Sequence, residues 1–216
     1  MQQTFLEELI IKGDEIVIGD YLMNNLSAIT EVTSYGVSPL MLSCYYKKPK
    51  ITQLLIERLE HITLFEAAAA GKFDVVAHEI FKHPTTINDY STDGFTALGL
   101  AAYFGSEEVA RYLVLKGADV NLPSENGFNV YPLHSAVAEN HISISRMLIE
   151  NDAKVNVAQM SGVTPLHSAA QNGSVETIIL LLEKGALVDV RMEGGKLPTD
   201  LAKEKGFEEI AEILSF

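Results

Sequence analysis

Two histidines, His134 and His167, are the residues of this sequence whose spacing most invites a chemical interpretation. They lie 33 residues apart, and a Pro-Leu pair precedes each of them. Equivalent positions in stacked units would place two imidazoles in one row, where they could bind a metal or transfer protons. However, Gly99 and Asp200 occupy the corresponding positions of other segments. We therefore predict a structural role in local hydrogen bonding for both histidines.

The other candidates for chemistry are weaker. Cys44 is the single cysteine, has no local signature of a nucleophile, and is predicted to be a small buried apolar residue. Gly194-Gly195 matches neither nucleotide-binding fingerprint. His78 and His83 are five residues apart, which is unsuitable for one helix face. We predict no catalytic residue, no cofactor and no metal, and therefore a protein that is not an enzyme.

The charge balance disfavours two classes of partner. The net charge is −13, from 29 acidic residues against 16 lysines and arginines. Nucleic acids and anionic membranes attract clustered basic residues, and the densest basic stretch, Lys47 to Lys50, is short enough to be a solvated helix start. The longest apolar run, residues 178–182, ends at Glu183. We expect no nucleic-acid partner and no membrane span, and, because the first residues lack a basic region, no secretory signal. A monomer in the cytoplasm is expected.

An internal repeat explains the spacing of the histidines. Pro132-Leu133-His134-Ser135-Ala136 recurs as Pro165-Leu166-His167-Ser168-Ala169. Weaker copies continue in both directions at intervals of 33 to 35 residues, except that only 24 residues separate Leu40 from Leu64. The anchor positions are Leu6, Leu40, Leu64, Leu98, Leu133, Leu166 and Thr199. A period of this length indicates a solenoid of about seven units.

Each unit is predicted to contain two short helices. Thr164 followed by Pro165 is typical of a helix start, because the threonine side chain caps free N–H groups and proline lacks one. Glycines such as Gly105 and Gly173 fall where a helix ends. An apolar stripe at i, i+4 spacing then indicates a second helix with one buried face. The fold class is therefore all-α.

The Thr-Pro-Leu-His-x-Ala-Ala core, the x-Gly-Ala-x-Val-Asn exit and the period together resemble the ankyrin repeat. The resemblance implies a curved stack of helix pairs with short β-hairpin tips, whose concave groove holds partner proteins. It extends over residues 1–216 as a single domain. The expected units are 1–33 as an amino-terminal cap, 34–60 truncated, 61–91, 92–124, 125–159, 160–192, and 193–216 as a carboxyl-terminal cap.

Two departures from the period carry structural expectations. The short interval between Leu40 and Leu64 predicts that residues 57–63 lack a hairpin, which should leave a gap or bend. The fifth unit gains Asn129 and Val130, which should lengthen its hairpin. The last unit carries many charged residues, as a terminal cap requires.

The resemblance also implies which residues face the groove, namely the two before each helix-ending glycine and the hairpin positions. Here these are rich in aromatic residues, which are frequent in binding hot spots. The predicted partner-binding residues are Tyr45, Tyr46, Tyr103, Phe104, Tyr90, Phe95, Phe128 and Tyr35. Ala69 and Ala70 lie between the two pairs on the first helices, and should leave a dip suited to an apolar group or an arginine.

The leading hypothesis is a non-enzymatic protein–protein interaction module whose partner has a basic or apolar surface. A secreted effector or toxin-neutralising, immunity-type protein is one alternative, favoured by the acidic balance and small size. A small-molecule sensor is another, with a pocket near the missing hairpin.

Overall fold

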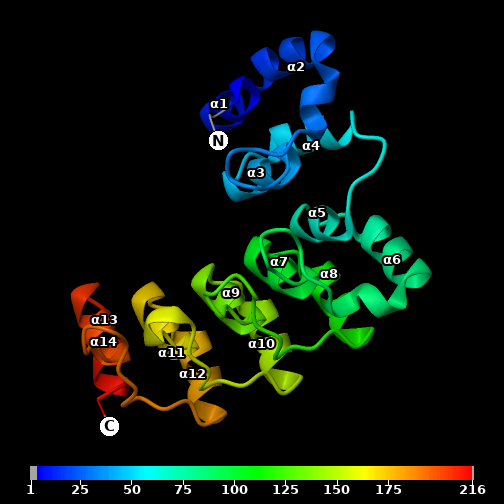
Figure 1. The fold of residues 1–216 in the computed structure, drawn as a ribbon. Coiled ribbons are helices and arrows are strands. Elements are labelled where there is room, and N and C mark those ends of the chain that lie inside the picture. Colours follow the sequence, from blue (N-terminus) through cyan, green and yellow to red (C-terminus); the bar gives the residue numbers. More distant parts are fainter. Residues whose placement is uncertain (1–3, 216) are drawn as a thin grey trace.

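The computed structural model describes residues 4–215, which form seven successive helix pairs (Figure 1). From α5 to α12, the odd-numbered helices lie on the inner side of the arc and the even-numbered helices on its outer side. Short 3-10 turns, η1 (Leu26–Thr30), η2 (Pro84–Asn88) and η3 (Met160–Gly162), lie in the connections. The pairs are α1 (Phe5–Lys12) with α2 (Glu15–Asn24), α3 (Pro39–Tyr45) with α4 (Pro49–Ile56), α5 (Leu64–Ala69) with α6 (Phe73–Lys82), α7 (Ala97–Phe104) with α8 (Glu107–Leu115), α9 (Pro132–Ala138) with α10 (Ile142–Glu150), α11 (Pro165–Asn172) with α12 (Val175–Glu183), and α13 (Pro198–Glu204) with α14 (Glu208–Ile213).

The helices begin and end where the sequence predicts. The hydroxyl of Thr96, for example, accepts a hydrogen bond from the backbone N–H of Gly99 and so caps α7. Gly105 and Gly173 end α7 and α11 in the left-handed conformation, with φ of 75° and 70°. These local signals fix short helices that cannot bury their apolar faces alone, so each pair depends on its neighbours.

One continuous core runs through the stack. Alanines at equivalent positions of the inner helices are fully buried, and their small side chains let neighbouring helices approach closely; these are Ala67, Ala101, Ala136 and Ala169. The outer helices contribute larger side chains to the same core, including the fully buried Leu113, Leu148 and Leu181. This alternation of small and large residues fills the space between units.

The tips between pairs are turns with little strand character. A backbone hydrogen bond closes each of them, from Thr33 N to Val37 O and at the equivalent positions 91 and 95, 124 and 130, 159 and 163, and 192 and 196. Within residues 4–215, strand-type pairing amounts to one bridge between Tyr90 and Thr96. The hairpins expected from the sequence are thus shorter than β-hairpins. The bond from Ser124 to Val130 spans two residues more than the others, which confirms the longer tip predicted for the fifth unit.

Neighbouring tips are also joined to one another. The N–H of Glu125 donates to the carbonyl of Gly94, that of Met160 to Phe128, and that of Glu193 to Ser161. Residues 57–63 contain no comparable tip in the described part of the chain, as predicted, and run directly from α4 into α5. The cap of the third unit lies one residue later than in its neighbours. Thr63 caps α5 directly before Leu64, whereas Ser38 lies two residues before Leu40. Leu64 is nevertheless buried, and the left-handed Gly71 follows it at the same interval as Gly105 follows Leu98, so the unit keeps the predicted register.

Candidate partner-binding groove

Tyr45, at the end of α3, lies across α5 and contacts the fourth helix pair. Its ring centroid is 5.2 Å from that of Phe104 and 6.2 Å from that of Tyr103. Its hydroxyl donates a 2.5 Å hydrogen bond to Asp93, in the tip between the third and fourth pairs. Burial, together with the Asp93 carboxylate, raises the pKa of Tyr45 well above its usual value. The stack changes direction at the third helix pair (Figure 1), where α5 has alanine at positions 67–69.

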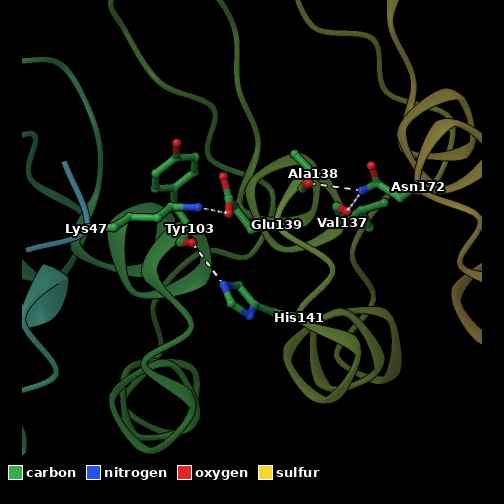
Figure 2. Close-up of polar contacts among 7 residues, drawn as sticks. All are labelled: Lys47, Tyr103, Val137, Ala138, Glu139, His141 and Asn172. Atoms are coloured by element: carbon green, nitrogen blue, oxygen red, sulfur yellow. Dashed lines mark hydrogen bonds and ion pairs between the residues drawn. The ribbon is translucent and has the colours of Figure 1, made fainter. Parts of the chain in front are cut away.

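A second long-range contact lies beside the first. The ammonium of Lys47 is 2.7 Å from the carboxylate of Glu139, at the end of α9 in the fifth pair. Figure 2 shows this ion pair beside the ring of Tyr103. Burial raises the pKa of Tyr103, and the nearby Glu139 carboxylate adds to the effect. The turn after α3 therefore contacts both the fourth and the fifth pairs.

Two side chains from turns and helix ends join neighbouring helix pairs in this region. Nε2 of His141 lies 3.0 Å from the carbonyl oxygen of Tyr103, and the side-chain amide of Asn172 donates to the carbonyls of Val137 and Ala138 (Figure 2). Each of these side chains comes from the next unit along the chain. They satisfy carbonyl groups that a helix end would otherwise leave unpaired.

The eight predicted aromatic residues separate into two groups. Tyr45, Phe95 and Phe104 are half-buried against the core, and Tyr90 is half-buried with its hydroxyl bound to the carbonyl of Pro123. Among the others, Tyr35 is 55% exposed, Phe128 54% and Tyr46 37%, while Tyr103 is half-buried. The hydroxyls of Tyr35 and Tyr46 are 3.3 Å apart and their rings meet edge to face. Among these eight residues, the exposed ones are thus Tyr35, Tyr46 and Phe128, with Tyr103 partly accessible.

The expected dip at Ala69 and Ala70 is present, but its surroundings differ from the prediction. A cleft of about 430 Å³ contains both alanines and Phe104. Lysines 47, 48 and 72 also line it, whereas the Tyr45 ring reaches over to Phe104. The end of the Lys48 side chain lies against Gly13, away from the two alanines. No carboxylate lines the cleft, so it offers no ion-pair partner to the arginine expected from the sequence.

A second cleft, of about 340 Å³, lies where the missing tip would fit between two existing tips. Residues from both tips line it, including Gly36 and Asp93, together with Thr63 and Phe65 at the start of α5. The truncation therefore opens the stack on its tip side as well as beside Ala69.

Both repeat histidines have structural roles. Nδ1 of His167 is 2.8 Å from the hydroxyl of Thr164 and accepts from its N–H, while Nε2 lies 3.3 Å from the carbonyl of Lys196 in the next tip. His134 makes the equivalent contacts with Tyr131 and Val163. A ring nitrogen facing a carbonyl must carry the proton, so the neutral Nε2–H tautomer fits both sites. Burial lowers the pKa of His134 to about 4.

The remaining candidates for chemistry are the Cys44 thiol and the side chains that could bind a metal. Cys44 is buried, and burial raises its pKa to about 11, so the thiol is protonated at neutral pH. Within residues 4–215, no cluster of three or more histidine, cysteine, aspartate or glutamate side chains has the geometry to hold a metal ion. In the same part of the chain, no helix has both the length and the apolar character needed to cross a bilayer.

The helix pairs, the capped histidines and the tip contacts define a repeat solenoid. The sequence matches the family model for ankyrin repeats (three copies) over residues 64–159 and again over residues 133–215. Because these matches extend over more than half of the chain, it belongs to the ankyrin-repeat family. Such repeats are in general non-enzymatic, and the match supports a protein–protein interaction module.

Similar proteins are of varied kinds. Ankyrin repeat and SAM domain-containing protein 6 of Rattus norvegicus is 34% identical over 93 residues, which is 43% of this chain and 10% of that protein. The RelA-associated inhibitor of Mus musculus is 29% identical over 100 residues, 46% of this chain and 12% of that protein. The probable 26S proteasome regulatory subunit p28 of Saccharomyces cerevisiae is 25% identical over 157 residues, 66% of this chain and 68% of that protein. This chain thus spans about a tenth of the length of the rat relative.

Proposed function

We propose that this chain binds a partner protein through the exposed aromatic side chains of its groove and tips, with Tyr46 and Tyr103 at the centre. The observation that carries the proposal is the exposed, edge-to-face pair of Tyr35 and Tyr46. Large aromatic side chains bury much area on binding and lose few rotatable bonds, which makes them frequent hot spots. The names of two relatives, a RelA-associated inhibitor and a proteasome subunit, also denote proteins that associate with other proteins.

The structure leads us to narrow the predicted binding set. Tyr45, Phe95 and Phe104 pack against the core, so their truncation would damage the fold as well as binding. Tyr46 and Phe128 are exposed, and their truncation should leave the fold intact. The test variants are therefore taken from the exposed group.

The experiment begins with affinity capture of the partner from native extract, followed by titration of the purified pair. Tyr46→Ala should weaken binding by about 2 kcal/mol, as expected for a central aromatic residue. Glu125→Ala is the matched control, because this exposed tip residue lies outside the aromatic set and should have little effect. Binding that Gln171→Ala abolishes while Tyr46→Ala leaves it unchanged would place the site in the carboxyl-terminal half and contradict the proposal.

A second candidate, a small-molecule sensor, rests on the cleft of about 340 Å³ at the missing tip. That volume lies at the lower end for small-molecule sites. A thermal-shift screen against metabolites tests it: a ligand whose stabilising effect is lost in Gly36→Leu would support the sensor. The absence of any such ligand would leave protein binding as the function.

A further inference from the structure

The hydrogen bonds that join neighbouring tips are interrupted where residues 57–63 form no tip. Elsewhere, the second residue of each tip donates its N–H to a carbonyl of the preceding tip; these donors are Glu125, Met160 and Glu193. The equivalent residue of the tip at residues 91–95 is the exposed Thr92. Within residues 4–215 its N–H has no hydrogen-bond partner. A backbone donor is therefore unpaired on one side of the gap.

The opposite side of the gap is open as well. Gly36, in the tip at residues 33–37, corresponds to Gly94, whose carbonyl accepts the bond from Glu125. The carbonyl of Gly36 accepts no hydrogen bond from the described part of the chain. A Cβ on Gly94 would lie 2.9 Å from Asn126 of the next tip, whereas a Cβ on Gly36 would meet nothing within 4 Å. Gly36 and Thr92 both line the cleft of about 340 Å³.

The first tip shows what can replace a missing neighbour. Ser34 is its second residue, and among residues 4–215 no other tip precedes it. The N–H and the hydroxyl of Ser34 donate to the buried carboxylate of Glu7, at 2.7 and 2.6 Å. An oxygen acceptor from another element thus takes the place of a preceding tip. The N–H of Thr92 is the one tip donor of this kind that the described chain leaves without such an acceptor.

The lining of the cleft combines apolar side chains with two carboxylates. Val32, Met41 and Phe65 supply the apolar part. The carboxylates, Glu66 and Asp93, accept hydrogen bonds from hydroxyl groups that line the same cleft. No lysine, arginine or histidine is among the lining residues. The cleft therefore disfavours an anionic occupant and suits a carbonyl oxygen, an apolar side chain and a cation.

The cleft adjoins the aromatic side chains assigned above to partner binding. The exposed Tyr35 directly precedes Gly36, and Tyr90 lines the cleft itself. One partner can therefore cover the exposed tyrosines and enter the gap between the tips.

We propose that this gap binds a tight turn of the partner protein, which takes the place of the missing tip. The turn supplies a backbone carbonyl to the N–H of Thr92 and an apolar side chain to the space beside Phe65. A lysine or arginine of the same turn lies near Glu66 and Asp93. A turn fits because each neighbouring tip is itself a turn closed by a backbone hydrogen bond. This inference rests on the proposed function and adds to it the shape and chemistry of the partner segment.

Selection of disulfide-closed cyclic peptides displayed on phage against the full chain tests the inference. Enriched peptides are synthesised with a fluorophore and titrated by fluorescence anisotropy, and we expect lysine or arginine beside leucine, isoleucine or phenylalanine. Thr92→Pro removes the N–H and suits the backbone, because Thr92 is the second residue of a turn closed from Gly94 N to Ser91 O. It should weaken binding about tenfold. Thr92→Ala keeps the N–H and should retain the affinity.

Thermal unfolding separates the binding role of this N–H from a role in folding. Glu193→Pro removes the equivalent N–H where it is bonded to Ser161, and should lower the melting temperature by about 2–4 °C. Thr92→Pro should not lower it, because no hydrogen bond is lost and proline restricts the unfolded chain. A decrease for Thr92→Pro as large as that for Glu193→Pro would overturn the inference.

Cyclic peptides that bind the Thr92→Pro protein as tightly as the parent would also overturn it, as would a selection that enriches no peptide or only acidic ones. A metabolite that binds the cleft when no peptide is enriched would assign the cleft to a small molecule instead. The proposed function can be judged separately. A captured partner whose binding is weakened by Tyr46→Ala but not by Thr92→Pro would support the proposed function and contradict this inference.

Discussion

The hydroxyl of Tyr45 and the carboxylate of Asp93 form a 2.5 Å hydrogen bond that connects the end of α3 to the tip after the third helix pair. The Ser91 hydroxyl donates to the other oxygen of the same carboxylate. Asp93 therefore holds both its own tip and a side chain from the second pair. This relationship connects the parts of the stack on either side of residues 57–63, where the tip is missing.

Tyr45→Phe and Asp93→Asn should each lower the free energy of unfolding. Because hydrogen bonds to charged groups are stronger than neutral ones, their coupling energy in a double-mutant cycle should be about 1–2 kcal/mol. Urea unfolding followed by circular dichroism measures it. Tyr46→Phe, at the exposed neighbouring position, should cost less than about 0.5 kcal/mol. A coupling energy near zero would mean that the hydrogen bond between Tyr45 and Asp93 does not contribute to stability in solution.

Lys47 occupies a left-handed position, with φ of 52°, where the fifth pair has Asn140 and the remaining pairs have glycine. Lys47→Gln removes its exposed ion pair and should cost less than about 1 kcal/mol. Lys47→Gly also loses the pair but relieves the backbone strain, so it should be about 1 kcal/mol more stable than Lys47→Gln. Thermal and urea unfolding of both variants give the comparison. A glycine variant less stable than the glutamine variant would contradict this account.

His134 should make the protein less stable in mild acid. The unfolded imidazole takes up a proton near pH 6.5, whereas the folded one does so only near pH 4. In this interval the unfolded state binds more protons, so stability falls as the pH falls, by up to about 3 kcal/mol. Urea unfolding at several pH values measures the slope. His134→Gln should show a shallower slope over the same interval, and equal slopes would refute the assignment.

Gly105 and Gly117 offer a matched pair of substitutions. Both have positive φ, of 75° and 95°, but a Cβ at Gly105 would lie 2.5 Å from the His141 ring, whereas one at Gly117 meets nothing. Gly117→Ala should therefore cost about 1 kcal/mol for backbone strain alone. Gly105→Ala should cost at least about 2 kcal/mol, because it also displaces His141 from the carbonyl of Tyr103. Similar unfolding midpoints for the two variants would show that the His141 side chain can move away from residue 105 without a loss of stability.

The sequence predicted the local features of the fold because local interactions determine them. The cap at Thr164, the helix end at Gly173 and the longer tip at Val130 all follow from residue types a few positions apart. In the third unit the anchor at Leu64 keeps its predicted register, because Gly71 follows it at the interval at which Gly105 follows Leu98. Its cap, Thr63, lies one residue later than in the neighbouring units, and the repeat spacing did not predict this shortening of α5.

The groove was predictable only in outline. Family geometry placed Tyr45 and Tyr46 together at the groove, but the contacts of Tyr45 with Phe104 and Asp93 determine which of the two is exposed. Tyr45 meets residues more than 40 positions away, and Lys47 meets Glu139 at 92 positions. Contacts over such separations depend on the curvature of the whole stack, and no short motif records that curvature.

The contacts that bypass the third helix pair also bear on how the chain should unfold. In a repeat protein whose units contact only their neighbours, structure is lost progressively from either end, and each interface acts as an independent link. Here Tyr45 and Lys47 connect the second pair to the fourth and fifth. The third pair therefore lies between helix pairs that also contact each other directly. Pairs two to five should therefore unfold as one cooperative block, while α13 and α14, held from one side only, exchange their amide hydrogens first.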